Sequence, residues 1–113
     1  MGFLKRLFGG GQGSKDDPDG LYFYFRANRS DEVVQVRLHR FNDLSLMDDG
    51  KTYFTRKMIV GSKSYERMEA EFMFDRNRNL ISCEVTGGDM VEQADFDAYV
   101  AAKSALENNE TEN

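Results

Sequence analysis

The chain has 113 residues, of which 40% are hydrophobic, 31% are charged and 12% are aromatic, and its formal net charge is −5. This length suits one domain with one hydrophobic core, and the charged fraction argues against a protein embedded in a membrane. With one cysteine, Cys83, and one histidine, His39, the chain cannot form an internal disulfide and lacks the ligands of the usual zinc sites. We therefore expect a soluble domain without a metal ion or a cofactor.

Basic and acidic residues are distributed unevenly along the chain. Residues 1–13 contain Lys5 and Arg6 but no acid, whereas residues 79–113 contain Lys103 and eight acids. Nucleic-acid-binding domains usually carry a basic surface. The acidic last third therefore argues against a uniformly basic nucleic-acid binder, although a locally basic surface in the middle of the chain stays open.

Residues 1–18 are expected to be a flexible leader, with a short amphipathic head and a Gly-rich tether. A helix over residues 2–8 would separate its large apolar side chains from Lys5 and Arg6, as in segments that lie weakly on membrane surfaces. The alternative is a frayed terminus, because helices of under about 12 residues are marginal in water. No secretory signal is recognisable, so we expect a cytoplasmic protein with at most peripheral membrane contact. The candidates for this contact are Phe3, Leu4, Leu7 and Phe8.

Five strands are predicted in the middle of the chain, because apolar residues recur at every second position after the turn that ends at Gly20. The predicted strands are residues 20–27, 32–40, 52–60, 64–75 and 79–86. Short turns join the first strand to the second, the third to the fourth and the fourth to the fifth, so these neighbours should run antiparallel. The longer link over residues 41–51 has room for one helical turn. Gly87 and Gly88 are expected to end the strands.

A helix is predicted from Gln93 to Leu106. One of its faces would carry four large side chains, those of Phe96, Tyr99, Val100 and Leu106. It is the one amphipathic element available to cover an apolar sheet face. The expected fold class is therefore α+β: over residues 19–106, a five-stranded antiparallel β-meander with one C-terminal helix packed on one face. Residues 107–113 are acidic and polar, and we expect this tail to be disordered.

Alternation assigns the two kinds of aromatic residue to opposite faces of the sheet. In the first strand Phe23 and Phe25 point to one side, and Tyr22 and Tyr24 point to the other. We expect the phenylalanine side to lie under the helix and the tyrosine side to face water. The candidates for a binding surface on the open side are Tyr22, Tyr24, Arg26, Arg37, His39, Tyr53, Lys57, Tyr65 and Arg67.

The third strand is assigned to these faces in the same way. Phe54, Met58 and Val60 are placed inside, and Tyr53 and Lys57 are placed outside. On this assignment Arg56 is the one charged residue of the inner set. We expect its stem to be buried at the edge of the core, with the guanidinium group in water.

The open face predicts a non-catalytic binding domain that contacts an unidentified protein partner, because Tyr and Arg are enriched at binding hot spots. One alternative is an ordinary exposed sheet face, where Tyr, Thr and Arg are also common. Another is a single-stranded nucleic-acid-binding domain, in which aromatic rings stack on bases and Arg contacts phosphates. Known RNA-recognition sheets alternate strands with helices, whereas five predicted strands precede the helix here. The oligomeric state is left open.

No catalytic residue is expected, and the chain is not interpreted as an enzyme. His39 is predicted near Arg37 and Arg40, and the sequence places no carboxylate to orient it as a base. Cys83 should point into the core, where a thiol behaves as a small apolar group.

Several segments resemble a family of small uncharacterised bacterial proteins. These segments are Met1–Gly10 (MGFLKRLFGG), Gly20–Arg26 (GLYFYFR), Arg40–Ser45 (RFNDLS), Val60–Lys63 (VGSK), Phe74–Arg78 (FDRNR) and Gly87–Gly88. In other members the resemblance implies a Cys-x-x-Cys zinc knuckle at the first hairpin and a further cysteine after the Gly-Ser-Lys turn. Here these positions hold Ala27, Ser30 and Ser64, none of which supplies a thiolate. The resemblance implies no function.

Overall fold

The structure is a computed structural model that describes residues 3–4 and 16–111. Its elements are β1 (Phe3–Leu4), β2 (Gly20–Ala27), β3 (Val33–His39), β4 (Ser45–Leu46), β5 (Tyr53–Val60), β6 (Arg67–Phe74), β7 (Leu80–Thr86), β8 (Gly88–Val91) and α1 (Gln93–Thr111). The five predicted strands correspond to β2, β3, β5, β6 and β7. The helix begins at the predicted residue and continues to Thr111.

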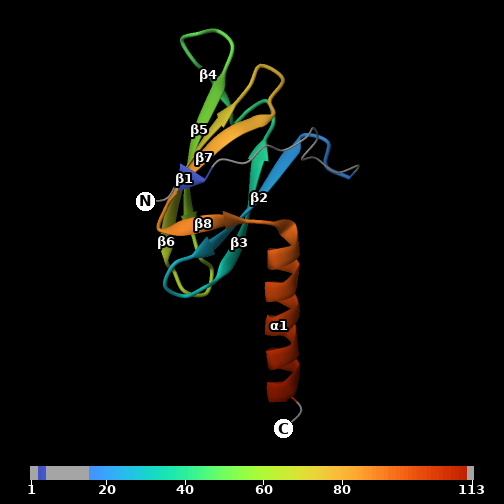
Figure 1. Cartoon of the computed structure of the whole chain (residues 1–113). Helices are drawn as coiled ribbons and strands as arrows, with labels where there is room; N and C mark the ends of the chain where they lie inside the picture. Colours follow the sequence, from blue (N-terminus) through green and yellow to red (C-terminus); the bar gives the residue numbers. More distant parts are fainter. Residues whose placement is uncertain (1–2, 5–15, 112–113) are drawn as a thin grey trace.

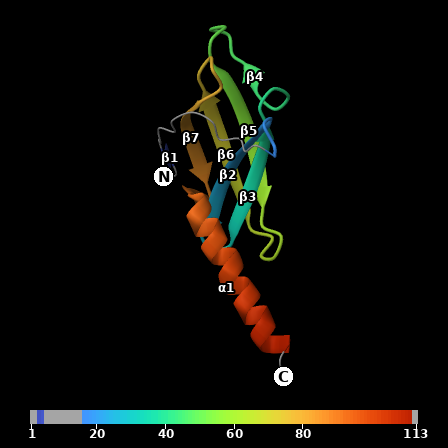
Figure 2. The same ribbon diagram turned by 90° about the vertical axis from the view of Figure 1, so that its right-hand side faces the viewer.

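The strands form two sheets, and every neighbouring pair of strands is antiparallel. One sheet has five strands in the order β1-β7-β6-β5-β4, and the other has three in the order β3-β2-β8. The two sheets face each other (Figures 1 and 2), and side chains from both sheets form one hydrophobic core. The α+β class is confirmed, but the single five-stranded meander is corrected: β2 and β3 pair with the unpredicted strand β8 and form a separate sheet.

The phenylalanine core lies between the two sheets. The ring centroids of Phe23 and Phe72 are 5.0 Å apart, and those of Phe25 and Phe72 are 6.0 Å apart. Phe25 and Phe72 are completely buried. The side of β2 that carries Phe23 and Phe25 is therefore covered by the five-stranded sheet, and the expectation that α1 would cover it is wrong.

The inner and outer faces of β5 are the reverse of the prediction. Ile59 lies opposite Met68 of β6, and both side chains are buried. Residues opposite one another in an antiparallel pair share a face. Tyr53 therefore points inward and packs against the core, whereas Met58 and Val60 are exposed on the outer face.

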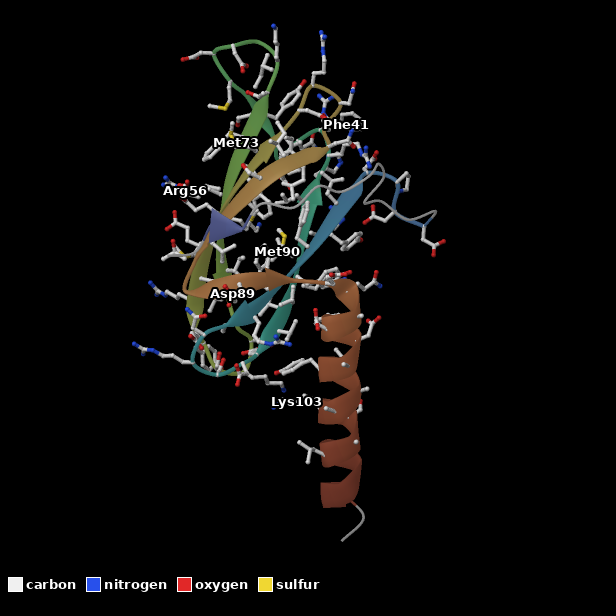
Figure 3. All side chains as sticks on the ribbon, viewed as in Figure 1. Phe41, Arg56, Met73, Asp89, Met90 and Lys103 are labelled. Atoms are coloured by element: carbon white, nitrogen blue, oxygen red, sulfur yellow. The ribbon has the colours of Figure 1, made fainter. Side chains whose placement is uncertain are left out.

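Arg56 belongs to this outer face and does not interrupt the core. Its Nε atom lies 3.0 Å from Glu69, and its Nη2 atom lies 2.8 Å from Glu71. Figure 3 shows Arg56 and Met73 on the outer side of the five-stranded sheet. The earlier placement of Arg56 at the edge of the core is therefore corrected.

The leader and the long link also differ from the prediction. Phe3 and Leu4 form a short strand opposite Glu84 and Cys83 of β7 and are not part of a helix. Leu7 and Phe8 lie outside the described residues. The link over residues 41–51 begins with one helical turn, in which the amide of Asp43 donates to the carbonyl of His39 at 3.1 Å, and it also contains the unpredicted strand β4.

Helix α1 packs on the outer face of the three-stranded sheet. The ring centroid of Phe96 lies 5.4 Å from that of Tyr24, which is only 7% exposed. Beyond its first turns the helix projects past the sheets (Figures 1 and 2), and Val100 and Leu106 are exposed. Within the described residues, no helix has both the length and the apolar character needed to cross a bilayer.

Candidate functional site

Two loops at one end of the sheets have the same backbone hydrogen-bond pattern. In residues 27–32 the amide of Ala27 donates to the carbonyl of Glu32 at 2.9 Å, and the amide of Asp31 donates to the carbonyl of Ala27 at 3.1 Å. In residues 61–66 the corresponding bonds run from Gly61 to Glu66 at 2.9 Å and from Tyr65 to Gly61 at 3.0 Å. We call residues 27–32 and 61–66 the paired loops.

A Ser-x-Glu segment occupies the same place in each paired loop. The Ser30 hydroxyl accepts a bond from the Glu32 amide at 3.2 Å, and the Ser64 hydroxyl accepts one from the Glu66 amide at 3.1 Å. The middle residue of each Ser-x-Glu segment has a positive φ, 63° at Asp31 and 59° at Tyr65. The two loops therefore share their backbone conformation as well as their sequence pattern.

The glutamate of each loop holds the other loop. Glu32 is 4% exposed, and its carboxylate accepts bonds from the amide and the hydroxyl of Ser64 at 2.9 and 2.8 Å. The Glu66 carboxylate accepts bonds from the amides of Arg29 and Ser30, both at 2.9 Å. Each loop thus supplies the acceptor for the backbone donors of the other, and the two loops are fixed together.

These hydrogen bonds set the pKa of both carboxyl groups. Burial raises the pKa of Glu32, but the bonds from Ser64 and Lys63 outweigh burial and lower it below its ordinary value. The pKa of Glu66 is lowered mainly by the bond from the Arg29 amide and also by that from Ser30. Both groups are therefore charged at neutral pH, the state in which a carboxylate accepts these bonds best.

A shallow depression of about 530 Å³ lies beside the paired loops. It is lined by Asn28, Arg29, Tyr65, Glu66, Arg67 and Gly87. Tyr65 is 76% exposed, the highest exposed fraction among the large hydrophobic side chains in the described part of the chain. A bulky residue at positive φ is uncommon and costs on the order of 1 kcal/mol. The loop geometry therefore holds a tyrosine ring in water, in a backbone conformation that glycine or asparagine would adopt with less strain.

The nine predicted binding residues do not form one surface. Four of them lie on the outer face of the three-stranded sheet, with His39 at the end of β3: Tyr22, Tyr24, Arg26 and Arg37. Tyr53 and Lys57 lie on the side of β5 that faces the other sheet. Tyr65 and Arg67 line the depression. The expected single open face is corrected, because the faces of β5 are reversed and α1 covers Tyr24.

Tyr22 and Arg37 are held by Asp17, which precedes the first predicted strand. The Asp17 carboxylate accepts hydrogen bonds from the Tyr22 hydroxyl and from Arg37, with a distance of 2.7 Å to Arg37 Nε. The bonds from Arg37 and Tyr22 hold the pKa of Asp17 well below its usual range, and the bond to Asp17 raises the pKa of Tyr22. This cluster ties the segment before β2 to the outer face of the sheet.

His39 and Cys83 both have structural contacts. The Nδ1 atom of His39 accepts bonds from the amides of Phe41 and Asn42 at 3.2 and 3.1 Å, so the ring caps the turn after β3. Cys83 is completely buried, and burial raises the pKa of its thiol to about 12. In the described part of the chain, no three side chains of His, Cys, Asp or Glu are grouped to hold a metal ion.

The sequence interpretation missed Glu32, Glu66 and Arg29. The signal for them is a short repeat, because Ser30-Asp31-Glu32 and Ser64-Tyr65-Glu66 occupy equivalent turns of two predicted hairpins. Its meaning depends on the two hairpin ends meeting in space, which the sequence does not specify. No known protein family, curated protein or solved structure matches the chain.

Proposed function

We propose that this protein is a non-catalytic binding domain that holds a protein partner at the depression beside the paired loops. The observation that carries this proposal is the exposed ring of Tyr65, which the hydrogen bonds between the loops hold at positive φ. Strained and exposed residues on a fixed scaffold are characteristic of functional sites. Tyrosine also offers a large contact area at a small cost in conformational entropy.

The rigidity of the paired loops supports this choice of surface. The backbone bonds of each loop and the two reciprocal glutamates leave Tyr65 on a fixed support, so binding needs little ordering of the backbone. The outer face of the three-stranded sheet is a weaker candidate. Tyr24 is covered there by Phe96, and the hydroxyl of Tyr22 is engaged by Asp17.

Exchanging the Tyr65 side chain tests the proposal. Tyr65→Asn removes the ring while keeping a residue that tolerates positive φ, so the loops should stay folded. Leu46→Asn is the matched control, since Leu46 is also exposed, at 57%, but lies on β4. In quantitative affinity capture with the full chain, Tyr65→Asn should lose the partner that the unchanged protein and Leu46→Asn retain. Equal capture by all three proteins would contradict the proposal.

A single-stranded nucleic acid is the second candidate ligand. Tyr65 together with Arg29 and Arg67 combines a ring for stacking with cations for phosphates. Fluorescence anisotropy with a short single-stranded oligonucleotide at low and high salt tests this candidate. Binding that weakens with added salt and disappears in Tyr65→Asn would favour it, and unchanged anisotropy at low salt would exclude it.

We also propose that the protein acts in the cytoplasm and that its leader makes weak peripheral contact with a membrane. The support is the sequence of residues 2–8, in which large apolar residues surround Lys5 and Arg6. Membrane fractionation of the full chain and of a chain without residues 1–15 tests this second point. Equal distribution of the two proteins would contradict it.

A further inference from the structure

Two guanidinium groups at the depression are not neutralised by ion pairs. In the described part of the chain, no carboxylate oxygen lies within 4.0 Å of a side-chain nitrogen of Arg29 or Arg67. Glu66 adjoins Arg67 in the sequence and also lines the depression, and both of its carboxylate oxygens accept bonds from backbone amides. Glu66 therefore holds the loop through backbone donors. Its charged carboxylate also interacts with the charge of Arg29, so it offsets part of the positive charge at the depression.

Two of the other described arginines, Arg37 and Arg56, show the contrasting arrangement, whereas the remaining four form no ion pair with another described residue: Arg26, Arg40, Arg76 and Arg78. Arg37 forms a two-point contact with Asp17, at 2.7 and 3.0 Å, and Arg56 lies between Glu69 and Glu71. In each case a carboxylate of the same chain already accepts the hydrogen bonds that the guanidinium group could otherwise donate to an external anion. Arg29 and Arg67 at the depression have no such carboxylate partner among the described residues.

The charges around the depression favour a compact anion over a long polyanion. The outer face of the five-stranded sheet continues from Arg67 to Glu69, Glu71 and Glu84, with Glu71 directly opposite Glu84. The chain as a whole carries a net charge of −5. Arg56 offsets part of this charge, because it pairs with Glu69 and Glu71, but three carboxylates against one guanidinium group still disfavour a long polyanion on this surface. The charge distribution therefore fits one compact oxyanion, held locally.

We propose that the depression is an oxyanion site, in which Arg29 and Arg67 bind one carboxylate or phosphate group carried by the partner protein. The inference rests on the proposed function and adds the chemical class of the group that is recognised. Asn28 also lines the depression, and its side-chain amide would be a further donor, because its backbone amide already donates to the carbonyl of Gly87. The Tyr65 ring would cover the apolar part of the residue that carries the oxyanion. Carboxylate and phosphate are both negatively charged, and each offers two oxygens that can accept a pair of hydrogen bonds from a guanidinium group.

Amide and arginine side-chain NMR spectra of the full chain provide the test. The probes are inorganic phosphate, an oligoglutamate peptide, a phosphoserine peptide and a single-stranded oligonucleotide, each added at constant ionic strength. The two peptides and phosphate distinguish the possible sources of the oxyanion. We expect at least one of these three probes to shift signals of Asn28, Arg29, Tyr65 and Arg67, and to leave those of Arg76 unchanged.

Charge-removing variants decide whether the two arginines carry the binding. Arg29→Gln and Arg67→Gln should each weaken binding by about tenfold, because each loses a charge-assisted hydrogen bond. Arg76→Gln, an exposed arginine in the turn between β6 and β7, should bind like the unchanged protein. Both target side chains are exposed, so the folded spectrum should persist in all three variants.

Two results would overturn the inference. One is the absence of localised shifts with phosphate and with both peptides, and the other is tighter binding of the oligonucleotide than of either peptide. The proposed function has its own outcome, because partner capture that depends on Tyr65 but not on Arg29 or Arg67 would leave it intact. Partner capture that depends neither on Tyr65 nor on the two arginines would contradict the proposed function as well.

Discussion

Glu32 shows how one buried carboxylate organises a surface loop. Its side chain is 4% exposed and accepts bonds from the Ser64 amide, the Ser64 hydroxyl and the Lys63 amide. Gly61 lies so close that a Cβ atom there would come well within contact distance of the carboxylate. A buried charge of this kind is tolerated because several donors replace its water.

Glu32→Gln should lower the free energy of unfolding by about 2 kcal/mol at neutral pH, because an amide cannot accept all the bonds made to this carboxylate. Glu84→Gln is the control, since Glu84 is exposed, and it should change the value by less than about 0.5 kcal/mol. Urea denaturation monitored by circular dichroism measures both effects. An equal stability of the unchanged protein and Glu32→Gln would contradict the role given to this residue.

The same comparison should depend on pH in a defined direction. The pKa of Glu32 in the folded protein lies below the ordinary value of 4.5, so its carboxylate stabilises the fold above pH 4.5. This contribution is lost as the pH falls through the lower pKa of the folded state. The stability difference between the unchanged protein and Glu32→Gln should therefore be largest near neutral pH and shrink in acid. A difference that grows in acid would contradict this assignment.

Cys83 should be unreactive in the folded protein. It is completely buried, and burial raises the pKa of its thiol to about 12, so the reactive thiolate is scarce and inaccessible at neutral pH. A colorimetric thiol reagent should give no rapid reaction under native conditions and one equivalent of thiol in denaturant. Fast reaction of the native protein would place this residue outside the core.

At the scale of elements, the first turns of α1 contact β2 and β3 of the three-stranded sheet. Phe96 packs on Tyr24, and the later turns of the helix extend beyond the sheets, where Val100 and Leu106 are exposed. Lys103 lies 5.6 Å from the ring of Tyr99, one turn away on the same helix. The first turns therefore anchor the element to the rest of the molecule.

Phe96→Ala should lower the free energy of unfolding by about 1–2 kcal/mol, because it removes a half-buried ring and its contact with Tyr24. Leu106→Ala, at a residue that is 58% exposed, should change it by less than about 0.5 kcal/mol. Thermal and urea denaturation of both variants measure this difference. Equal effects of the two changes would show that the helix is not anchored at Phe96.

The sequence predicted the existence of these elements better than their faces. The bounds of β2 and the start of α1 agree with the prediction. In β5, however, apolar residues occur on both faces of the strand, with Ile59 on one face and Met58 on the other. Pairing with Met68 of β6 decides which side is inner, and that partner lies outside the strand. β8 was missed because Gly87 and Gly88 were interpreted as the end of the strands.

At the scale of the whole molecule, the second sheet accounts for most of the remaining differences. A helix was expected to cover the phenylalanines because alternation identifies an apolar face but not the element that covers it. The two sheets cover each other's phenylalanines, so α1 packs on the opposite side of the sheet β3-β2-β8 and the tyrosines of β2 are partly enclosed. Tyr65 and Arg67 were among the nine candidates named from the sequence, whereas the reciprocal bonds of Glu32 and Glu66 depend on the two hairpin ends meeting in space.

The most direct test of the proposed binding surface is photo-crosslinking from Tyr65. A photoreactive phenylalanine derivative at this position keeps a bulky ring on the paired loops, and the same group at Leu46 provides the control at another exposed position. On irradiation in living cells, the protein labelled at residue 65 should form a discrete crosslinked complex that the protein labelled at residue 46 does not form. A complex formed only from residue 46, or none from residue 65, would contradict the assignment of the paired loops as the binding surface.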